Sequence, residues 1–210
     1  MTRILLISGD TREGSLHTAA LRTAVRFAPA DIGVLRYDGL RDLPAFVPGE
    51  PAMPAPVALL RHRAGAADAV LISTPEYAGS LPGSLKNLLD WLAEGGDLRG
   101  KPAAWLSVTP PAQDQAALTT LEAVLAHAGA RVLKPACIRI PLAPQAVDEQ
   151  GIVNDPQLHT ALQDMLRALA RSLAAPEPRQ PPSWQVHSSL YPVVPRRESS
   201  PRFSPGRLYT

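Results

Sequence analysis

The segment SGDTREGSLHT, residues 8–18, combines residue types that bind phosphate. It follows a short apolar run and leads into a pattern typical of a helix, so its polar side chains lie at a helix start. There the unpaired N–H groups and the positive end of the helix dipole stabilise an anion. Thr11, Arg12, Ser15 and Thr18 supply further donors, a set that suits a phosphate monoester. The alternative is a plain helix cap, in which the hydroxyls only satisfy the first N–H groups.

Two common phosphate motifs do not match this loop. Gly9 and Gly14 have the spacing of a nucleoside-triphosphate P-loop, but Ser15 stands where that motif requires lysine. The dinucleotide motif GxGxxG fails as well, because Thr11 occupies its second glycine position. Neither motif therefore predicts the ligand.

A second stretch, STPEYAGSLPGSLKNLLDWL at residues 73–92, follows another buried apolar run. Together with the first loop it resembles the NAD(P)H-dependent FMN reductases, flavodoxin-like enzymes that include quinone, azo-dye and chromate reductases. That family carries GSxRxxSxN after its first strand and TPEYxxSxPGxLKNxxDW after its third. The resemblance covers residues 3 to about 173. The residues that match the second pattern are Thr74, Pro75, Glu76, Tyr77, Ser80, Pro82, Gly83, Leu85, Lys86, Asn87, Asp90 and Trp91.

The resemblance implies an enzyme with bound FMN and with NADPH or NADH as electron donor. The FMN phosphate would lie among Arg12, Ser15 and His17, and the flavin ring against residues 75–78, where the backbone N–H groups of the turn after Pro75 can face N5 and O4. No catalytic side chain and no metal are implied, because flavin N5 accepts the hydride directly. The implied cofactor-binding residues are Gly9, Thr11, Arg12, Ser15, His17, Thr18, Pro75, Glu76, Tyr77, Ala78, Gly79, Ser80, Ser107 and Thr109.

The sequence departs from the family pattern at three places. Asp10 replaces the serine of GSxR, His17 replaces the asparagine, and SVTPPAQDQ (residues 107–115) replaces a glycine-rich loop that many relatives carry. His17 can still donate a hydrogen bond, and does so more strongly below an ordinary pKa near 6.5. In the third loop, residues 107–110 are expected to border the flavin.

Asp10 leaves two outcomes open. A carboxylate about 4 Å from one phosphate charge costs about 1 kcal/mol in water and about 4 kcal/mol at an effective dielectric constant of 20. Either Asp10 turns to pair with Arg12 or to cap the helix, which leaves FMN bound, or it faces the phosphate. In the second case FMN is bound weakly or not at all.

Apolar runs alternate with amphipathic segments along residues 1–174, which we interpret as one domain of the α/β class. Crossover helices between strands favour a right-handed, doubly wound parallel sheet, with ligands at the carboxyl ends of its strands. The resemblance makes this a flavodoxin-like, five-stranded sheet in the order 2-1-3-4-5 with helices on both faces. Strands are predicted at 3–8, 32–37, 69–73, within 101–108 and at 131–140, and helices at 15–28, 57–67, 84–94, 113–128 and 156–173.

Several residues have a structural explanation. Trp91, Leu85, Leu88 and Leu89 are expected to pack, and similar proteins use this helix in a dimer interface. Lys86 and Asp90 have the spacing of a surface ion pair, and Cys137 reads as a small core residue inside the last strand. The proline-rich segment 38–56, with Phe46, is a candidate flap over a flavin site.

Composition restricts the partners and the compartment. A formal net charge of +2 over 210 residues requires neither nucleic acid nor an anionic membrane as a partner, and no apolar run is long enough to span one. A single cysteine and a first strand without signal-peptide features favour the cytoplasm. Residues 175–210, rich in Pro, Ser and Arg, are interpreted as a tail that is disordered or docked on the surface.

Three functions are compatible with these observations. The first is a reductase, a homodimer or homotetramer, that passes electrons from NAD(P)H through FMN to a quinone, flavin, azo compound, metal oxyanion or oxygen. The second is a flavodoxin-like module with a degraded flavin site that acts as an interaction or assembly protein through its tail, and Asp10 supports it. The third, a one-electron carrier, ranks last because such proteins dock through an acidic surface that this composition lacks.

Overall fold

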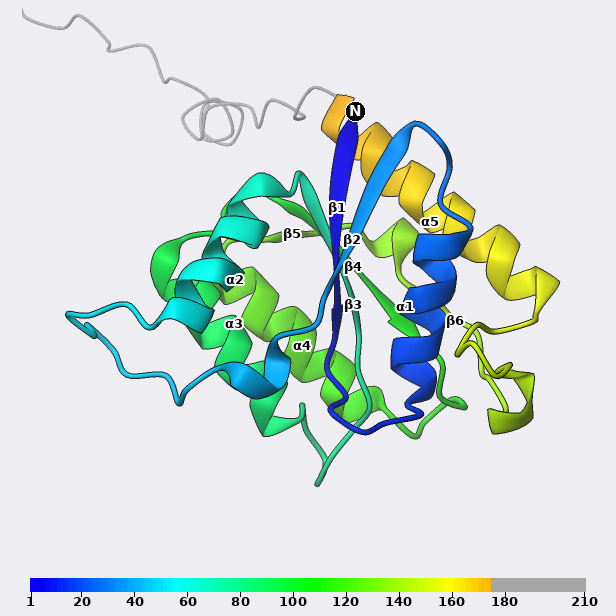
Figure 1. The fold of residues 1–210 in the computed structure, drawn as a ribbon, viewed down its shortest axis with the longest axis horizontal. Helices are drawn as coiled ribbons and strands as arrows, with labels where there is room; N and C mark the ends of the chain where they lie inside the picture. The colour runs from blue at the N-terminus through cyan, green and yellow to red at the C-terminus, as the bar shows by residue number, and fades with distance from the viewer. Residues whose placement is uncertain (175–210) are drawn as a thin grey trace, which may run out of the picture. The chain divides into compact units, whose positions relative to one another are not determined.

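The computed structural model describes residues 1–174, and the predicted tail 175–210 lies outside them. A parallel sheet in the order β2-β1-β3-β4-β5 forms the centre (Figure 1), with the predicted order of its first five strands. Among the described residues, no helix is long and apolar enough to cross a membrane. The strands are β1 (Thr2–Ser8), β2 (Ile32–Tyr37), β3 (Ala69–Ser73), β4 (Pro102–Ser107), β5 (Arg131–Val132) and β6 (Ile138–Arg139), of which β6 pairs with β4.

Helices cover both faces of the sheet (Figure 1), because successive side chains of the central strands point to opposite sides. In β1, Leu5 and Ile7 pack with α2, α3 and α4, whereas Ile4 and Leu6 pack with α1 and α5. All four of these side chains are buried, as expected for a parallel strand with helices on either side. The helices are α1 (Leu16–Arg26), α2 (Ala55–Ala66), α3 (Gly83–Gly95), α4 (Gln115–His127) and α5 (Pro156–Ala174).

The prediction of one continuous last strand over 131–140 is wrong. A 3-10 turn, Lys134–Ala136, separates β5 from β6. Pro135 lies in this turn, and proline cannot donate to a sheet ladder, which explains the interruption. Cys137 is therefore not inside a strand but ends the turn, half-buried, where burial raises the pKa of its thiol. A thiol with a raised pKa is a poor nucleophile, which agrees with the packing role expected for it.

The segment 38–56 is less loop-like than predicted. It contains a 3-10 turn, Leu40–Asp42, and its last two residues already belong to α2. Its middle is fixed to α3: the Phe46 N–H donates to Asn87 Oδ1 over 2.7 Å, and the Phe46 ring meets Trp91 edge-on at a centroid distance of 4.9 Å. Trp91 Nε1 also donates to the Pro44 carbonyl. Phe46 thus packs on α3 within its own chain, and a place over a flavin in an assembly stays a prediction.

The strand register brings the loops after β1, β3 and β4 to one edge of the sheet. Ser8 lies beside Ser73, and the Gly9 N–H donates to the Ser73 carbonyl over 2.8 Å. A Cβ on Gly9 would lie 2.3 Å from Thr74 Oγ1, so close packing between these two strand ends requires glycine there. The chemistry-bearing loops of the sequence therefore meet at the carboxyl edge that is typical of ligand sites in such sheets.

Candidate flavin site

A cavity of about 510 Å³ lies between these three loops, within the usual range for small-molecule sites. Of the predicted cofactor-binding residues it is lined by Arg12, Ser15, His17, Pro75, Glu76, Tyr77 and Thr109. Thr11 and Thr18 instead line an adjoining cavity of about 200 Å³ together with Asp10. Gly9, Ala78, Gly79, Ser80 and Ser107 line neither cavity.

Sequence reasoning missed the wall contributed by Leu142 and Pro144. These residues follow β6 and carry no motif, so nothing local in the sequence marks them. Their position comes from pairing: the N–H groups of Ile140 and Leu142 donate to the carbonyls of Ser107 and Val108 over 2.8 and 2.9 Å. Only the sheet order could have placed this segment beside the loop after β4.

The first loop ends in a helix cap that is compatible with anion binding. The Ser15 hydroxyl accepts from the Thr18 N–H over 3.4 Å, and Gly14 has a φ of 72°, a conformation that favours glycine. The amides of Leu16 and His17 at the start of α1 have no intrahelical partners. The plain-cap and phosphate-site interpretations thus coexist, since one hydroxyl caps the helix while two N–H groups remain for an anion.

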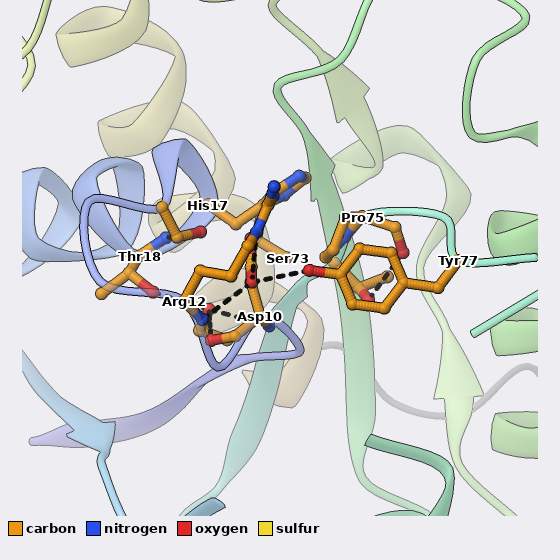
Figure 2. Close-up of polar contacts among 10 residues, drawn as sticks. Asp10, Arg12, His17, Thr18, Ser73, Pro75 and Tyr77 are labelled. Atoms are coloured by element: carbon orange, nitrogen blue, oxygen red, sulfur yellow. Dashed lines mark hydrogen bonds and ion pairs between the residues drawn. The ribbon is translucent and has the colours of Figure 1, made fainter. Parts of the chain in front are cut away.

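Asp10 pairs with Arg12, the first of the two outcomes left open by the sequence. The Arg12 side chain donates to the Asp10 carboxylate through Nη2 at 2.8 Å and through Nε at 3.1 and 3.2 Å, and the Arg12 N–H donates at 3.0 Å. Tyr77 Oη donates to the same carboxylate over 2.9 Å (Figure 2). Burial alone raises the pKa of Asp10, but these hydrogen bonds outweigh it and hold that pKa well below its usual range.

His17 does not titrate near 6.5 as expected. Its side chain is buried, and its Nδ1 lies 2.9 Å from Ser73 Oγ. The Ser73 hydroxyl in turn donates to the Leu106 carbonyl over 2.8 Å. Nδ1 therefore carries the proton and donates to the serine, which leaves Nε2 as an acceptor in the neutral ring. Burial lowers the pKa of His17 to about 4, so the ring is neutral at pH 7. This residue joins α1 to the ends of β3 and β4 and adds no positive charge to the phosphate loop.

The loop after β3 is a two-residue hairpin turn. Tyr77 and Ser80 exchange backbone hydrogen bonds of 2.9 and 3.0 Å, and both residues between them, Ala78 (φ 49°) and Gly79 (φ 71°), have positive φ angles. Two consecutive positive φ angles define a type I′ turn. Glu76 anchors this turn, because its Oε2 accepts from the Ala117 N–H in the first turn of α4 over 3.0 Å. The carboxylate of Glu76 is thus used to hold the loop against α4, and a flavin contact of this residue stays a prediction.

The loop after β4 is braced by a buried ion pair. Asp114, whose side chain is fully buried, pairs with Arg139 of β6 and accepts a hydrogen bond from Ser107 Oγ. Arg139 Nη1 also donates to Ser107 Oγ and to the Thr109 carbonyl, at 3.0 and 3.1 Å. Ser107 was expected to border the flavin, but its side chain lies behind the cavity wall and supports Val108, Thr109 and Pro110, which line it.

The model of the family described as NADPH-dependent FMN reductase matches residues 2–145 of this chain. The chain belongs to that family. It is an oxidoreductase of the FMN- and NAD(P)H-dependent type.

Relatives and solved structures agree with this assignment. An NAD(P)H-dependent FMN reductase of Pseudomonas aeruginosa is 33% identical over 172 residues, which cover 80% of this chain and 92% of the relative. A quinone reductase of Escherichia coli K12 is 38% identical over 105 residues, 48% of this chain and 56% of the relative. FerB, a flavoenzyme NAD(P)H:acceptor oxidoreductase of Paracoccus denitrificans, superposes with a TM-score of 0.71 at 27% identity, covering 83% of this chain and 98% of FerB.

The residues of this reductase fit a flavin ring more completely than they fit a phosphate. The ring and its side chain would meet apolar walls at Pro75, Val108 and Leu142, beside the turn that begins at Tyr77. The phosphate would find two helix N–H groups and Arg12, but that guanidinium already has a carboxylate partner. FMN therefore fits the site, with its phosphate held less strongly than the donor set alone would suggest.

Proposed function

We propose that this reductase binds FMN between the phosphate loop and the Tyr77–Ser80 turn and passes electrons from NADPH or NADH to a small acceptor. The observation that carries the proposal is the convergence of three loops on one cavity, with Arg12, Pro75 and Thr109 on three of its sides. FMN, when bound, supplies the hydride acceptor and the electron carrier. The residues of the chain position the cofactor: Glu76 anchors the turn to α4 and so holds it beside the space proposed for the ring.

Quinones are the acceptor class we favour, because relatives with up to 38% identity are named quinone reductases. Free flavins, azo compounds, metal oxyanions and oxygen are the other candidates. We also propose a homodimer or homotetramer in the cytoplasm, in which α3 and the segment 38–56 face a partner subunit. The fourteen residues given in the sequence analysis remain our proposed cofactor contacts, with Ser107, Gly9 and Glu76 acting by supporting the loops.

The substitution Thr109→Trp tests the location of the site. Thr109 lines the cavity with a side chain that makes no hydrogen bond among residues 1–174, so a large ring there occupies the space proposed for flavin. We expect loss of FMN retention on desalting and loss of NAD(P)H oxidation with a quinone under nitrogen. The matched control is Thr119→Trp on the exposed side of α4, which is expected to keep both. Retention of FMN and activity by Thr109→Trp would place the flavin elsewhere.

The second candidate is a flavodoxin-like module without flavin chemistry. The observation that favours it is the buried negative charge of Asp10 within the phosphate loop, although its pairing with Arg12 is the arrangement expected to leave FMN bound. In that case the purified wild-type protein is colourless, gains no thermal stability from FMN, and does not oxidise NAD(P)H in the presence of excess FMN. Turnover with added FMN would exclude this candidate even if no flavin survives purification.

A further inference from the structure

The loop proposed to bind the FMN phosphate, residues 8–18, carries a negative charge of its own. Residues 8–18 hold two acids, Asp10 and Glu13, against the single cation Arg12, and burial keeps His17 neutral at pH 7. The formal charge of the loop is therefore −1, although a phosphate monoester is itself largely dianionic above a pKa of about 6. A loop that binds phosphate strongly needs the opposite balance.

Asp10 cannot turn out of the loop without losing several contacts. Its side chain is 0% exposed, whereas that of Arg12 is 65% exposed. Besides Arg12, the hydroxyl of Tyr77 donates to Asp10 from the opposite side of the loop (Figure 2). Of the two charges the carboxylate is thus the fixed one and the guanidinium the adaptable one. An incoming phosphate would therefore share Arg12 with Asp10 and would not displace that acid.

Most hydroxyls of the loop are occupied as well. Ser8 Oγ and Thr18 Oγ1 bond each other over 2.9 Å, and Ser15 Oγ accepts from the Thr18 N–H and bonds Asp10. What remains for a phosphate are the Thr11 hydroxyl, the two amides at the start of α1 and the shared guanidinium. The rest of the cavity, which would receive the flavin ring, has apolar walls such as Pro75 and Leu142. Their contact with the ring would not depend on whether the other end of the ligand carries a phosphate.

We propose that the flavin site of this reductase takes unphosphorylated flavins as readily as FMN, and that Asp10 is the residue that sets this selectivity. The proposal rests on the proposed function, since it concerns the same cavity. The charge of the loop itself repels the phosphate, and the cations that could offset this repulsion, Arg22, Arg36 and Arg41, line the adjoining cavity and are not part of the loop. The flavin is therefore held mainly through its ring, as an exchangeable ligand that enters and leaves between turnovers. Riboflavin, which has the ring and the ribityl chain of FMN without its phosphate, is the probe that separates the two parts of the site.

The test compares dissociation constants for FMN and riboflavin, measured by quenching of flavin fluorescence in a chloride buffer at about pH 7.5, where the phosphate is dianionic. For the wild type we expect the two constants to agree within about tenfold, or about 1.4 kcal/mol. The variant Asp10→Ser, which restores the family residue, should raise the preference for FMN over riboflavin at least tenfold. Loss of the hydrogen bond between Tyr77 and Asp10 affects the binding of the ring, which both flavins share, so the ratio of the two constants reports on the phosphate alone. Asp31→Ser, which removes an exposed acid before β2, is the matched control and should behave as the wild type.

A wild type that prefers FMN by more than tenfold overturns the proposal, as does an Asp10→Ser variant with an unchanged ratio of the two constants. Should Asp10→Ser fail to fold by circular dichroism, Asp10→Asn removes the charge at constant size and must shift the ratio in the same direction. Absence of binding of both flavins to both the wild type and the folded variant would refute the proposed function instead, so the two failures are distinguishable.

Discussion

Replacing Asp114 by Asn tests whether a buried ion pair holds the loop after β4 in place. Asp114 is fully buried, and the substitution removes a charge that balances Arg139, whose side chain is 20% exposed. Removing one partner of a buried pair costs about 3–5 kcal/mol because the remaining charge stays desolvated. Since Arg139 keeps some access to water, we expect about 3 kcal/mol, the lower end of that range.

The assay is urea denaturation followed by far-UV circular dichroism, in which the midpoint should fall while the slope m stays constant. The control is Asp90→Asn, which breaks the exposed i,i+4 pair with Lys86 on α3 and should cost less than about 0.5 kcal/mol. A loss below about 1 kcal/mol for Asp114→Asn, comparable to one ordinary hydrogen bond, would refute the bracing role.

Two further substitutions test the other loops. Ala78→Gly should stabilise the protein by about 1 kcal/mol in the same urea assay, because residue 78 has a φ of 49° that costs alanine about 1–2 kcal/mol; a neutral or destabilising result contradicts the type I′ geometry. His17→Asn should flatten the stability–pH profile. The pKa of folded His17, about 4, lies below the unfolded value near 6.5, so the unfolded state binds the proton first and the wild type loses stability as pH falls from about 6.5 to 4, by an amount on the order of 3 kcal/mol. An unchanged slope in the variant would show that another group titrates.

Alternation of apolar runs and amphipathic segments was enough to predict the order of the elements, because buried parallel strands and amphipathic helices differ in period. It failed at residues 131–140, where Pro135 interrupts the ladder while the apolar residues around it still resemble a strand. The position of Leu142 in the cavity wall could not be predicted for a different reason. This position depends on which strands are neighbours in the sheet, and the local sequence around Leu142 does not determine that order.

The side-chain contacts of the site residues also could not be predicted from the local sequence. The family resemblance implies that Glu76 and Tyr77 lie against the flavin, and this stays a prediction. The sequence did not indicate that their side chains bond α4 and Asp10, partners 41 and 67 residues away in the chain. The sequence shows the charge that Asp10 adds to the loop. It does not show whether the carboxylate points toward Arg12 or toward the phosphate, because the local sequence permits both orientations. In the structure Asp10 is turned toward Arg12, and Tyr77, which follows another strand, supplies a further donor that the local sequence could not reveal.

These long-range contacts join the three loops into one framework. Asp10 and His17 tie the first loop to β3 and its turn, Glu76 ties that turn to α4, and Asp114 ties the start of α4 to β6. The contacts of His17, Glu76 and Tyr77 use polar side chains that lie in the family motifs and that the resemblance assigns to cofactor binding. On our proposal, backbone groups and apolar side chains therefore make most of the contacts with the cofactor. A flavin enzyme can accept this arrangement because hydride transfer needs a fixed ring and no side-chain acid or base. The same reasoning accounts for an acid at position 10: on our proposal it lowers the affinity for phosphate, and its hydrogen bond fixes Tyr77 at the wall of the cavity proposed for the ring.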